Sequence, residues 1–151
     1  MVKRFVIYGF LGLSAEIFWT GLGSLLKGDI KLTGYTYIWM FLIYGLAVFL
    51  EPMHDKIRSW PLMLRGGVYM VILFSIEYSS GWLLRSIIGT CPWNYGNGPL
   101  SINGLIRLDF APVWFCCGLG FERVHDAIDR LFFLLGAHKH KKSYLVIKIL
   151  I

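Results

Sequence analysis

Four long apolar stretches follow one another along the chain, at about residues 5–26, 35–50, 66–90 and 110–136. Each is close to the roughly 20 helical residues that cross a hydrocarbon core of about 30 Å, although charged residues interrupt the last one. The alternation of apolar and polar residues that marks a membrane β-strand is absent. Because helices satisfy their backbone hydrogen bonds internally in lipid, the pattern predicts an all-α integral membrane protein, a bundle of four transmembrane helices.

The composition agrees with a membrane location. Of 151 residues, 56% are hydrophobic and only 16% are charged, and the mean hydropathy is +0.61. An ordinary soluble domain has about 25% charged residues and a smaller apolar share. The lipid bilayer is therefore the first expected partner.

The basic residues predict an orientation. With four spans, both termini and the loop between the second and third spans lie on one side, and this side holds most of the lysines and arginines. Loops rich in these residues are normally cytoplasmic, so both termini are predicted to be cytoplasmic. Residues 1–136 would form one membrane domain and residues 137–151 a basic cytoplasmic tail. The basic run His138–Lys142 suits an anionic lipid surface, and no nucleic-acid-binding motif accompanies it.

The chain also resembles itself in two halves, at about 1–60 and 61–130. A shift of 61 positions superimposes the first apolar stretch on the third, and a shift of 71 superimposes the second on the fourth. The matched pairs include Arg4/Arg65, Tyr8/Tyr69, Ser14/Ser75, Glu16/Glu77, Glu51/Glu122, His54/His125 and Asp55/Asp126. The difference between the two shifts places an insertion near residues 90–108. The pattern predicts two parallel two-helix repeats, related by an axis roughly along the membrane normal.

Each predicted span carries one glutamate, at Glu16, Glu51, Glu77 and Glu122. A carboxylate within a span costs about 2.5–3.5 kcal/mol on insertion scales and normally faces a bundle interior or a wet cavity. The four glutamates are therefore expected to converge. Pro52 is expected to disfavour α geometry at Glu51 and to kink or restart the second helix there.

The motif E-x-x-H-D occurs twice, at Glu51–Asp55 and at Glu122–Asp126. Residues three and four apart share a helix face, so each motif forms one polar stripe. A lone Glu on two helices with Glu-x-x-His on two others is the ligand set of dinuclear iron and manganese bundles, and these hard ligands suit either metal. The predicted metal ligands are Glu16, Glu51, His54, Glu77, Glu122 and His125, with Asp55 and Asp126 as outer-shell partners. Such a site would act on a lipid-like or quinone-like substrate.

Two other functions fit the same residues. In a permease or transporter subunit, the acids would carry protons or bind a cationic substrate near the repeat axis. In a non-catalytic scaffold, the polar cluster would only fix the helix register. A rise of about 1.5 Å per residue places Glu16 and Glu77 deeper than the other two glutamates, which weakens the dinuclear-metal hypothesis. The sequence identifies no catalytic residue and does not decide whether the chain is an enzyme.

Residues 90–115, TCPWNYGNGPLSINGLIRLDFAPVWF, contain several prolines and glycines that break any helix. A connection of this length in a small bundle is commonly a lid, a re-entrant segment or a binding element. The predicted loop anchors are Arg85, Arg107, Asp109, Trp93 and Tyr95. An interfacial plug held by its aromatic residues is the alternative to a substrate lid.

Five motifs resemble one known family: YGLAVFLEPMHD, GWLLR, CPWNY, INGLIRLDFAPVWF and GLGFERVHD. They span nearly all of residues 5–130, and they are similar to the putative type IV ABC-transporter family, which includes the transmembrane protein 229 group. The resemblance implies a membrane protein related to transport. The chain has no G-x-x-x-x-G-K-[ST] nucleotide site, so any ATPase is expected to be a separate subunit. Assembly as a homo-oligomer is left open.

Overall fold

The structure, a computed structural model, describes the backbone of residues 1–149 and the side chains of residues 1–136. The α-helices are α1 (Val2–Leu26), α2 (Ile38–Gly45), α3 (Glu51–Ile57), α4 (Leu62–Ile88) and α5 (Ala111–Ile149), and the 3₁₀ helices are η1 (Leu46–Leu50) and η2 (Leu108–Phe110). The strands β1 (Ser101–Ile102) and β2 (Ile106–Arg107) pair antiparallel in the loop before α5. The fold is all-α, as the sequence predicts.

Within residues 1–149, two helices are long and apolar enough to cross a membrane, α1 and α4. The second predicted span is instead three consecutive segments, α2, η1 and α3, which run from Ile38 to Ile57. The fourth lies in the first part of α5, where charged residues from Glu122 onward interrupt the apolar pattern. The structure therefore supports two membrane-crossing helices where the sequence predicted four.

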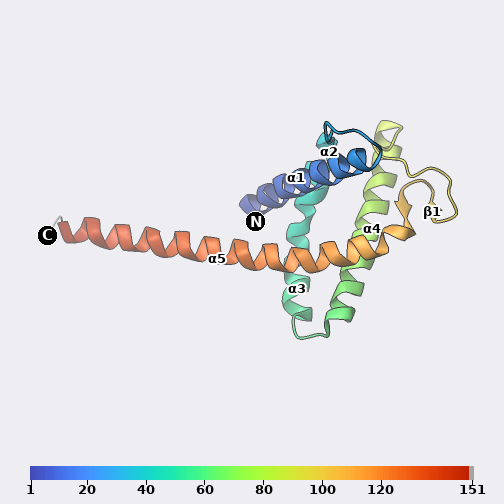
Figure 1. The fold of residues 1–151 in the computed structure, drawn as a ribbon. Helices are drawn as coiled ribbons and strands as arrows, with labels where there is room; N and C mark the ends of the chain where they lie inside the picture. Colours follow the sequence, from blue (N-terminus) through green and yellow to red (C-terminus); the bar gives the residue numbers. More distant parts are fainter. Residues whose placement is uncertain (150–151) are drawn as a thin grey trace.

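The helix α5 continues to Ile149, beyond the predicted end of the fourth apolar stretch at residue 136. Figure 1 shows that its C-terminal part extends past the other helices. The predicted basic tail therefore begins inside a helix. The surroundings of its side chains, and residues 150 and 151 altogether, lie outside the described residues.

The predicted restart of the second helix at Pro52 is confirmed. The helix α3 begins at Glu51 with Pro52 in its first turn, where the missing N–H has no helical partner to lose. The five preceding residues take the tighter 3₁₀ form. The expectation for Glu51 itself is wrong, because it keeps right-handed α geometry with φ −55° and ψ −53°.

The helices contact one another mainly in two pairs, α1 with α2 and α4 with α5, and α5 crosses both α3 and α4 (Figure 1). Small residues allow the backbones to approach closely, as in other membrane helices. A Cβ atom on Gly118 would lie 2.1 Å from the Cβ of Tyr69, so this close approach requires glycine. Tyr69 is fully buried at this crossing, with 0% of its surface exposed.

Candidate functional site

Polar side chains gather where α1, α3, α4 and α5 meet. We call this group the histidine cluster, and its members are Arg4, Tyr8, Glu51, His54, Arg65, Tyr69, Glu122 and His125. Three of its polar residues are nearly inaccessible, with exposures of 1% for His54, 4% for His125 and 7% for Glu122. Buried groups of this kind need hydrogen-bond or charge partners to be tolerated.

Glu51, in α3, is contacted by side chains from two other helices, α1 and α5. Arg4 Nη1 lies 2.7 Å from Glu51 Oε1, and the Tyr8 hydroxyl donates a hydrogen bond of 2.8 Å to the same oxygen. His125 Nδ1, from α5, lies 3.4 Å from this oxygen and 3.4 Å from the Tyr8 hydroxyl. Glu51 therefore connects α1 to α5.

Glu122, in α5, has the corresponding partners. Arg65 Nη1 lies 3.5 Å from Glu122 Oε2, and His54 Nδ1 lies 3.6 Å from Oε1. The same His54 nitrogen is 3.1 Å from the Tyr69 hydroxyl, which itself lies beside Glu122. Each glutamate thus meets the arginine and tyrosine of its own half of the chain and the histidine of the other half.

The formal charges of the histidine cluster balance. Glu51 pairs with Arg4 and Glu122 pairs with Arg65, so with neutral imidazoles the cluster carries no net charge. The sequence analysis expected the glutamates to converge, and packed carboxylates repel one another unless a positive charge lies between them. Arg4 and Arg65 supply this charge for Glu51 and Glu122.

The two imidazole rings meet edge to face at the centre, with centroids 5.2 Å apart and planes at 73°. On their outer sides lie two aspartates: His125 Nε2 is 3.5 Å from Asp129 Oδ2, and His54 Nε2 is 3.9 Å from Asp126 Oδ1. Asp126 is held by Arg58 at 3.0 and 3.1 Å, and Asp129 pairs with Arg4. Among the described residues, His54 Nε2 is buried without a hydrogen-bond partner.

Glu16 and Glu77 lie elsewhere. On α1, Glu16 is eight positions beyond Tyr8, and on α4, Glu77 is eight positions beyond Tyr69, a rise of about 12 Å in each case. Glu16 Oε2 accepts hydrogen bonds from Thr36 Oγ1 at 2.6 Å and from the Tyr44 hydroxyl at 3.0 Å. The six residues predicted as metal ligands therefore fall into two groups, because the two turns of helix between them separate the glutamates along each axis.

Glu77 borders a partly open cavity of about 80 Å³ between α2 and α4. We call it the Glu77 cavity, and its lining residues are Met40, Ile43, Tyr44, Ala47, Leu50, Leu73, Ile76, Glu77, Ser80, Trp93 and Trp114. Glu77 Oε1 accepts a hydrogen bond of 2.6 Å from the Tyr95 hydroxyl, and Oε2 accepts one of 3.2 Å from Trp114 Nε1. Among these lining residues, Glu77 is the only charged one.

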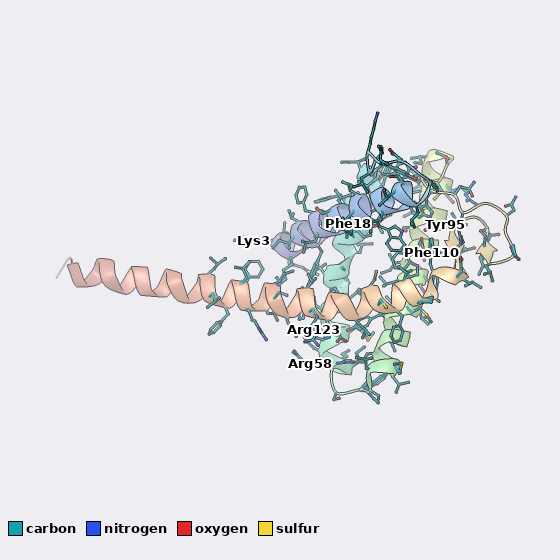
Figure 2. The ribbon with its side chains drawn as sticks, in the orientation of Figure 1. Lys3, Phe18, Arg58, Tyr95, Phe110 and Arg123 are labelled. Atoms are coloured by element: carbon teal, nitrogen blue, oxygen red, sulfur yellow. The ribbon has the colours of Figure 1, made fainter. Side chains whose placement is uncertain are left out.

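The loop before α5 contributes to the lining of this cavity. Trp93 lines it and is fixed by a hydrogen bond of 2.9 Å from its Nε1 to the Leu105 carbonyl. Burial and the adjacent Glu77 raise the pKa of the Tyr95 phenol, so Tyr95 stays protonated and donates. Figure 2 shows Tyr95 beside Phe110 near the start of α5, far from Arg58 at the other end of α4.

The other predicted loop anchors have different partners from those expected. Arg85 donates a hydrogen bond of 3.1 Å to the Asn103 carbonyl and so joins α4 to the loop. Arg107 and Asp109 pair with each other inside the loop instead of reaching a helix, and this pairing lowers the pKa of the Asp109 carboxyl. Their pairing joins two positions of the loop, and an anchoring role for them stays a prediction.

Sequence reasoning assigned no role to Arg4, Tyr8, Arg65 and Tyr69, which complete the histidine cluster. The sequence did contain a signal for these residues, because Arg4 matches Arg65 and Tyr8 matches Tyr69 under the shift of 61 positions. Their roles could not be read because each depends on a contact with a helix far along the chain. Tyr44 and Thr36, the partners of Glu16, gave no comparable signal.

The fold and these two polar groups define a small α-helical membrane protein with charged residues held inside its helix packing. The chain belongs to the family described as "Putative ABC-transporter type IV", which it matches over residues 4–151. This confirms the resemblance seen in its motifs. No solved structure matches the chain. The transporter-related family and the two helices able to cross a membrane support a membrane location.

Proposed function

We propose that this chain is a permease-type membrane subunit of a transporter and that the Glu77 cavity binds the cationic head group of its substrate. The observation that carries the proposal is one carboxylate at the edge of an otherwise apolar and aromatic cavity. Carboxylates at membrane depth commonly mark substrate or ion pathways. The family supports the transport context.

The donors around Glu77 leave room for a ligand. Tyr95 and Trp114 each donate one hydrogen bond to a different oxygen of the carboxylate. Each carboxylate oxygen has two lone-pair directions, so a second donor can approach both oxygens. Both partners are neutral, and the negative charge of Glu77 therefore stays available to a cation.

The rest of the lining suits an organic cation better than a metal ion. Tyr44, Trp93 and Trp114 bring aromatic rings, whose faces attract ammonium groups. The remaining walls are mostly aliphatic. A cavity of about 80 Å³ is smaller than a typical drug-sized site of about 300–1,000 Å³. A head group fits, and the apolar part of the substrate would lie in the lipid.

The loop is assigned the role of a lid in this proposal. It supplies both Trp93, which lines the cavity, and Tyr95, which binds Glu77. Opening the loop would break the Tyr95 hydrogen bond and expose the carboxylate, so loop movement and substrate binding would be coupled. Energy coupling would come from a separate ATPase subunit, in line with the family description.

We also infer that the two halves of the chain are structural repeats. The inference is supported by the matched contacts of the histidine cluster, in which Arg4–Glu51 corresponds to Arg65–Glu122 and Glu51–His125 corresponds to Glu122–His54. In these contacts, the glutamate of each half meets the histidine of the other half. A central axis between the two imidazoles would relate them.

Binding of a matched pair of probes tests the substrate proposal. Benzyltrimethylammonium and its neutral carbon isostere, neopentylbenzene, are titrated into protein in lipid nanodiscs, and the fluorescence of the tryptophans reports binding. We expect the cation to bind saturably and at least about 10-fold more tightly than the isostere, and Glu77→Gln to remove this preference, since the substitution removes the coulombic attraction between the quaternary ammonium and the carboxylate.

Asp29→Asn is the matched control, because it removes a carboxylate that lies in the α1–α2 loop and does not line the Glu77 cavity. It should leave cation binding unchanged. Equal affinity for the cation and the isostere in the wild-type protein, or an undiminished preference in Glu77→Gln, would overturn the proposed function.

A further inference from the structure

We propose that the histidine cluster is a binding site for one divalent transition-metal ion, with His54, His125 and Asp55 as its protein ligands. One ligand atom from each of these three residues lies within 4.8 Å of one from each of the others. The site lies on α3 and α5, apart from the Glu77 cavity, and does not depend on the proposed function. It also differs from the six-ligand dinuclear centre predicted from the sequence.

The first argument is the orientation of the imidazoles. His125 Nδ1 lies 3.4 Å from Glu51 Oε1, and His54 Nδ1 lies 3.1 Å from the Tyr69 hydroxyl and 3.6 Å from Glu122 Oε1. A histidine that binds a metal through Nε2 normally donates its Nδ1–H to a carboxylate or another oxygen. Both rings have such partners at Nδ1, which leaves Nε2 as the metal-binding position. His54 Nε2 has no hydrogen-bond partner among the described residues, whereas His125 Nε2 lies 3.5 Å from Asp129 Oδ2, a contact that a metal ion would replace.

The second argument is an unsatisfied nitrogen. Within the described part of the chain, His54 Nε2 has no hydrogen-bond partner, and the His54 side chain is only 2% exposed. The nearest charged oxygen, Asp126 Oδ1, is 3.9 Å away and is already held by Arg58. A buried polar atom in this state calls for a ligand. A metal ion would satisfy it directly.

The third argument concerns the carboxylates. Glu51 and Glu122 are paired with Arg4 and Arg65 and contact the Nδ1 sides of the rings. They therefore serve as orienting partners, and not as the ligands that the sequence analysis predicted. Asp55 is exposed at the surface next to His54, where it supplies a negative charge and an entry route for the ion. The roles of the glutamates and of Asp55 are exchanged relative to the sequence prediction.

The three ligand atoms must move somewhat closer together to bind one metal ion. Ligand atoms around a tetrahedral zinc ion, with bonds of about 2.0–2.1 Å, are about 3.4 Å apart. Side-chain rotation of Asp55 and a small approach of the two rings would bring the three atoms from their present separations to this value. Two imidazoles and one carboxylate suit zinc or ferrous iron, whereas magnesium and calcium prefer oxygen ligands.

Metal titration of tag-free protein tests the site. The protein is purified without a histidine tag, treated with chelator, and titrated with Co²⁺, whose visible absorption reports coordination; Zn²⁺ is then added in competition. We expect one equivalent of Co²⁺ per chain, displaced by Zn²⁺, and a rise in the melting temperature on binding. Absence of stoichiometric binding would overturn the proposal.

Variants distinguish this site from the histidines of the tail. His54→Gln and His125→Gln should weaken binding at least 100-fold, and Asp55→Asn, an exposed position that folding tolerates, should weaken it about 10- to 100-fold. Glu122→Gln should weaken it about 10-fold by releasing His54, as orienting partners typically do. The double variant His138→Ala/His140→Ala is the control and should bind normally. Binding that is lost in this control, or retained in Asp55→Asn and His54→Gln, would overturn the assignment.

Discussion

The carboxylates of the histidine cluster have charged partners, whereas the carboxylate at the Glu77 cavity has neutral ones. In the cluster, Glu51 and Glu122 each face an arginine, and the charges cancel. At the cavity, Glu77 receives hydrogen bonds from Tyr95 and Trp114, which are neutral. A carboxylate paired with an arginine fixes the positions of helices. A carboxylate with only neutral partners keeps its attraction for a cation. Two similar acids in one helix bundle can therefore have different roles.

The two regions also differ in how they join the fold. The cluster connects four helices through buried contacts, so a missing member leaves a charge without a partner. The cavity is partly open, and one of its lining residues, Trp93, comes from the loop before α5. Substitutions in the cluster should therefore act mainly on stability, and substitutions at the cavity mainly on binding. The predictions below test this difference.

The largest effect is expected for Arg65→Ala. It leaves Glu122, whose side chain is only 10% exposed, without its cationic partner. Loss of one partner of a buried ion pair typically costs about 3–5 kcal/mol, and the partial exposure of this pair favours the lower end. Reversible unfolding in detergent measures it. Glu77→Gln should change stability by less than about 1 kcal/mol, and an equal loss in both variants would remove the distinction between the two regions.

A packing change should have the next largest effect. In Gly118→Ala the new methyl group would meet the Cβ of Tyr69 at 2.1 Å, so α4 and α5 must separate. Overpacking of this kind costs about 1–3 kcal/mol. Gly120→Ala, two positions away on α5 with open space around its Cβ, is the control and should be neutral or slightly stabilising. Cation binding at the Glu77 cavity should survive in both variants.

Tyrosine substitutions compare the two halves of the cluster. Tyr8→Phe removes the hydrogen bond to Glu51, and Tyr69→Phe removes the contact with His54. Each should cost about 1.5 kcal/mol, because a hydrogen bond to a charged or buried group is lost. Similar losses in unfolding experiments would support the inferred repeat. A large loss in one variant and none in the other would contradict it.

The smallest effect concerns the loop and its acid sensitivity. The Arg107 pairing lowers the pKa of Asp109 in the folded protein below its usual value of about 3.9. A lowered folded pKa means that the stabilisation is complete above the unfolded pKa and is lost as the pH falls through the folded value. The protection factors of the amides in residues 101–107, which correct for the intrinsic exchange rate at each pH, should therefore fall in acid. In Asp109→Asn the protection factors should be lower at neutral pH and lose this acid dependence.

Much of the local structure could be predicted from the sequence. Hydropathy and length identify α1 and α4, Pro52 marks the start of α3, and the glycine-rich and proline-rich stretch marks the loop before α5. These features depend on residues close together in the chain. The family and the membrane location follow from the same local patterns. The orientation of the termini stays a prediction.

The site itself depended on tertiary structure. The sequence shows one glutamate for each apolar stretch and two matching E-x-x-H-D motifs. It does not show which of these side chains are in contact. Helical rise separates Glu16 and Glu77 from the histidines, and helix crossing brings Arg4 to Glu51 and Arg65 to Glu122. Contacts between residues up to 121 positions apart decide which nitrogen of each imidazole is engaged. Such contacts follow from the angle and depth at which the helices cross, and no local pattern encodes them.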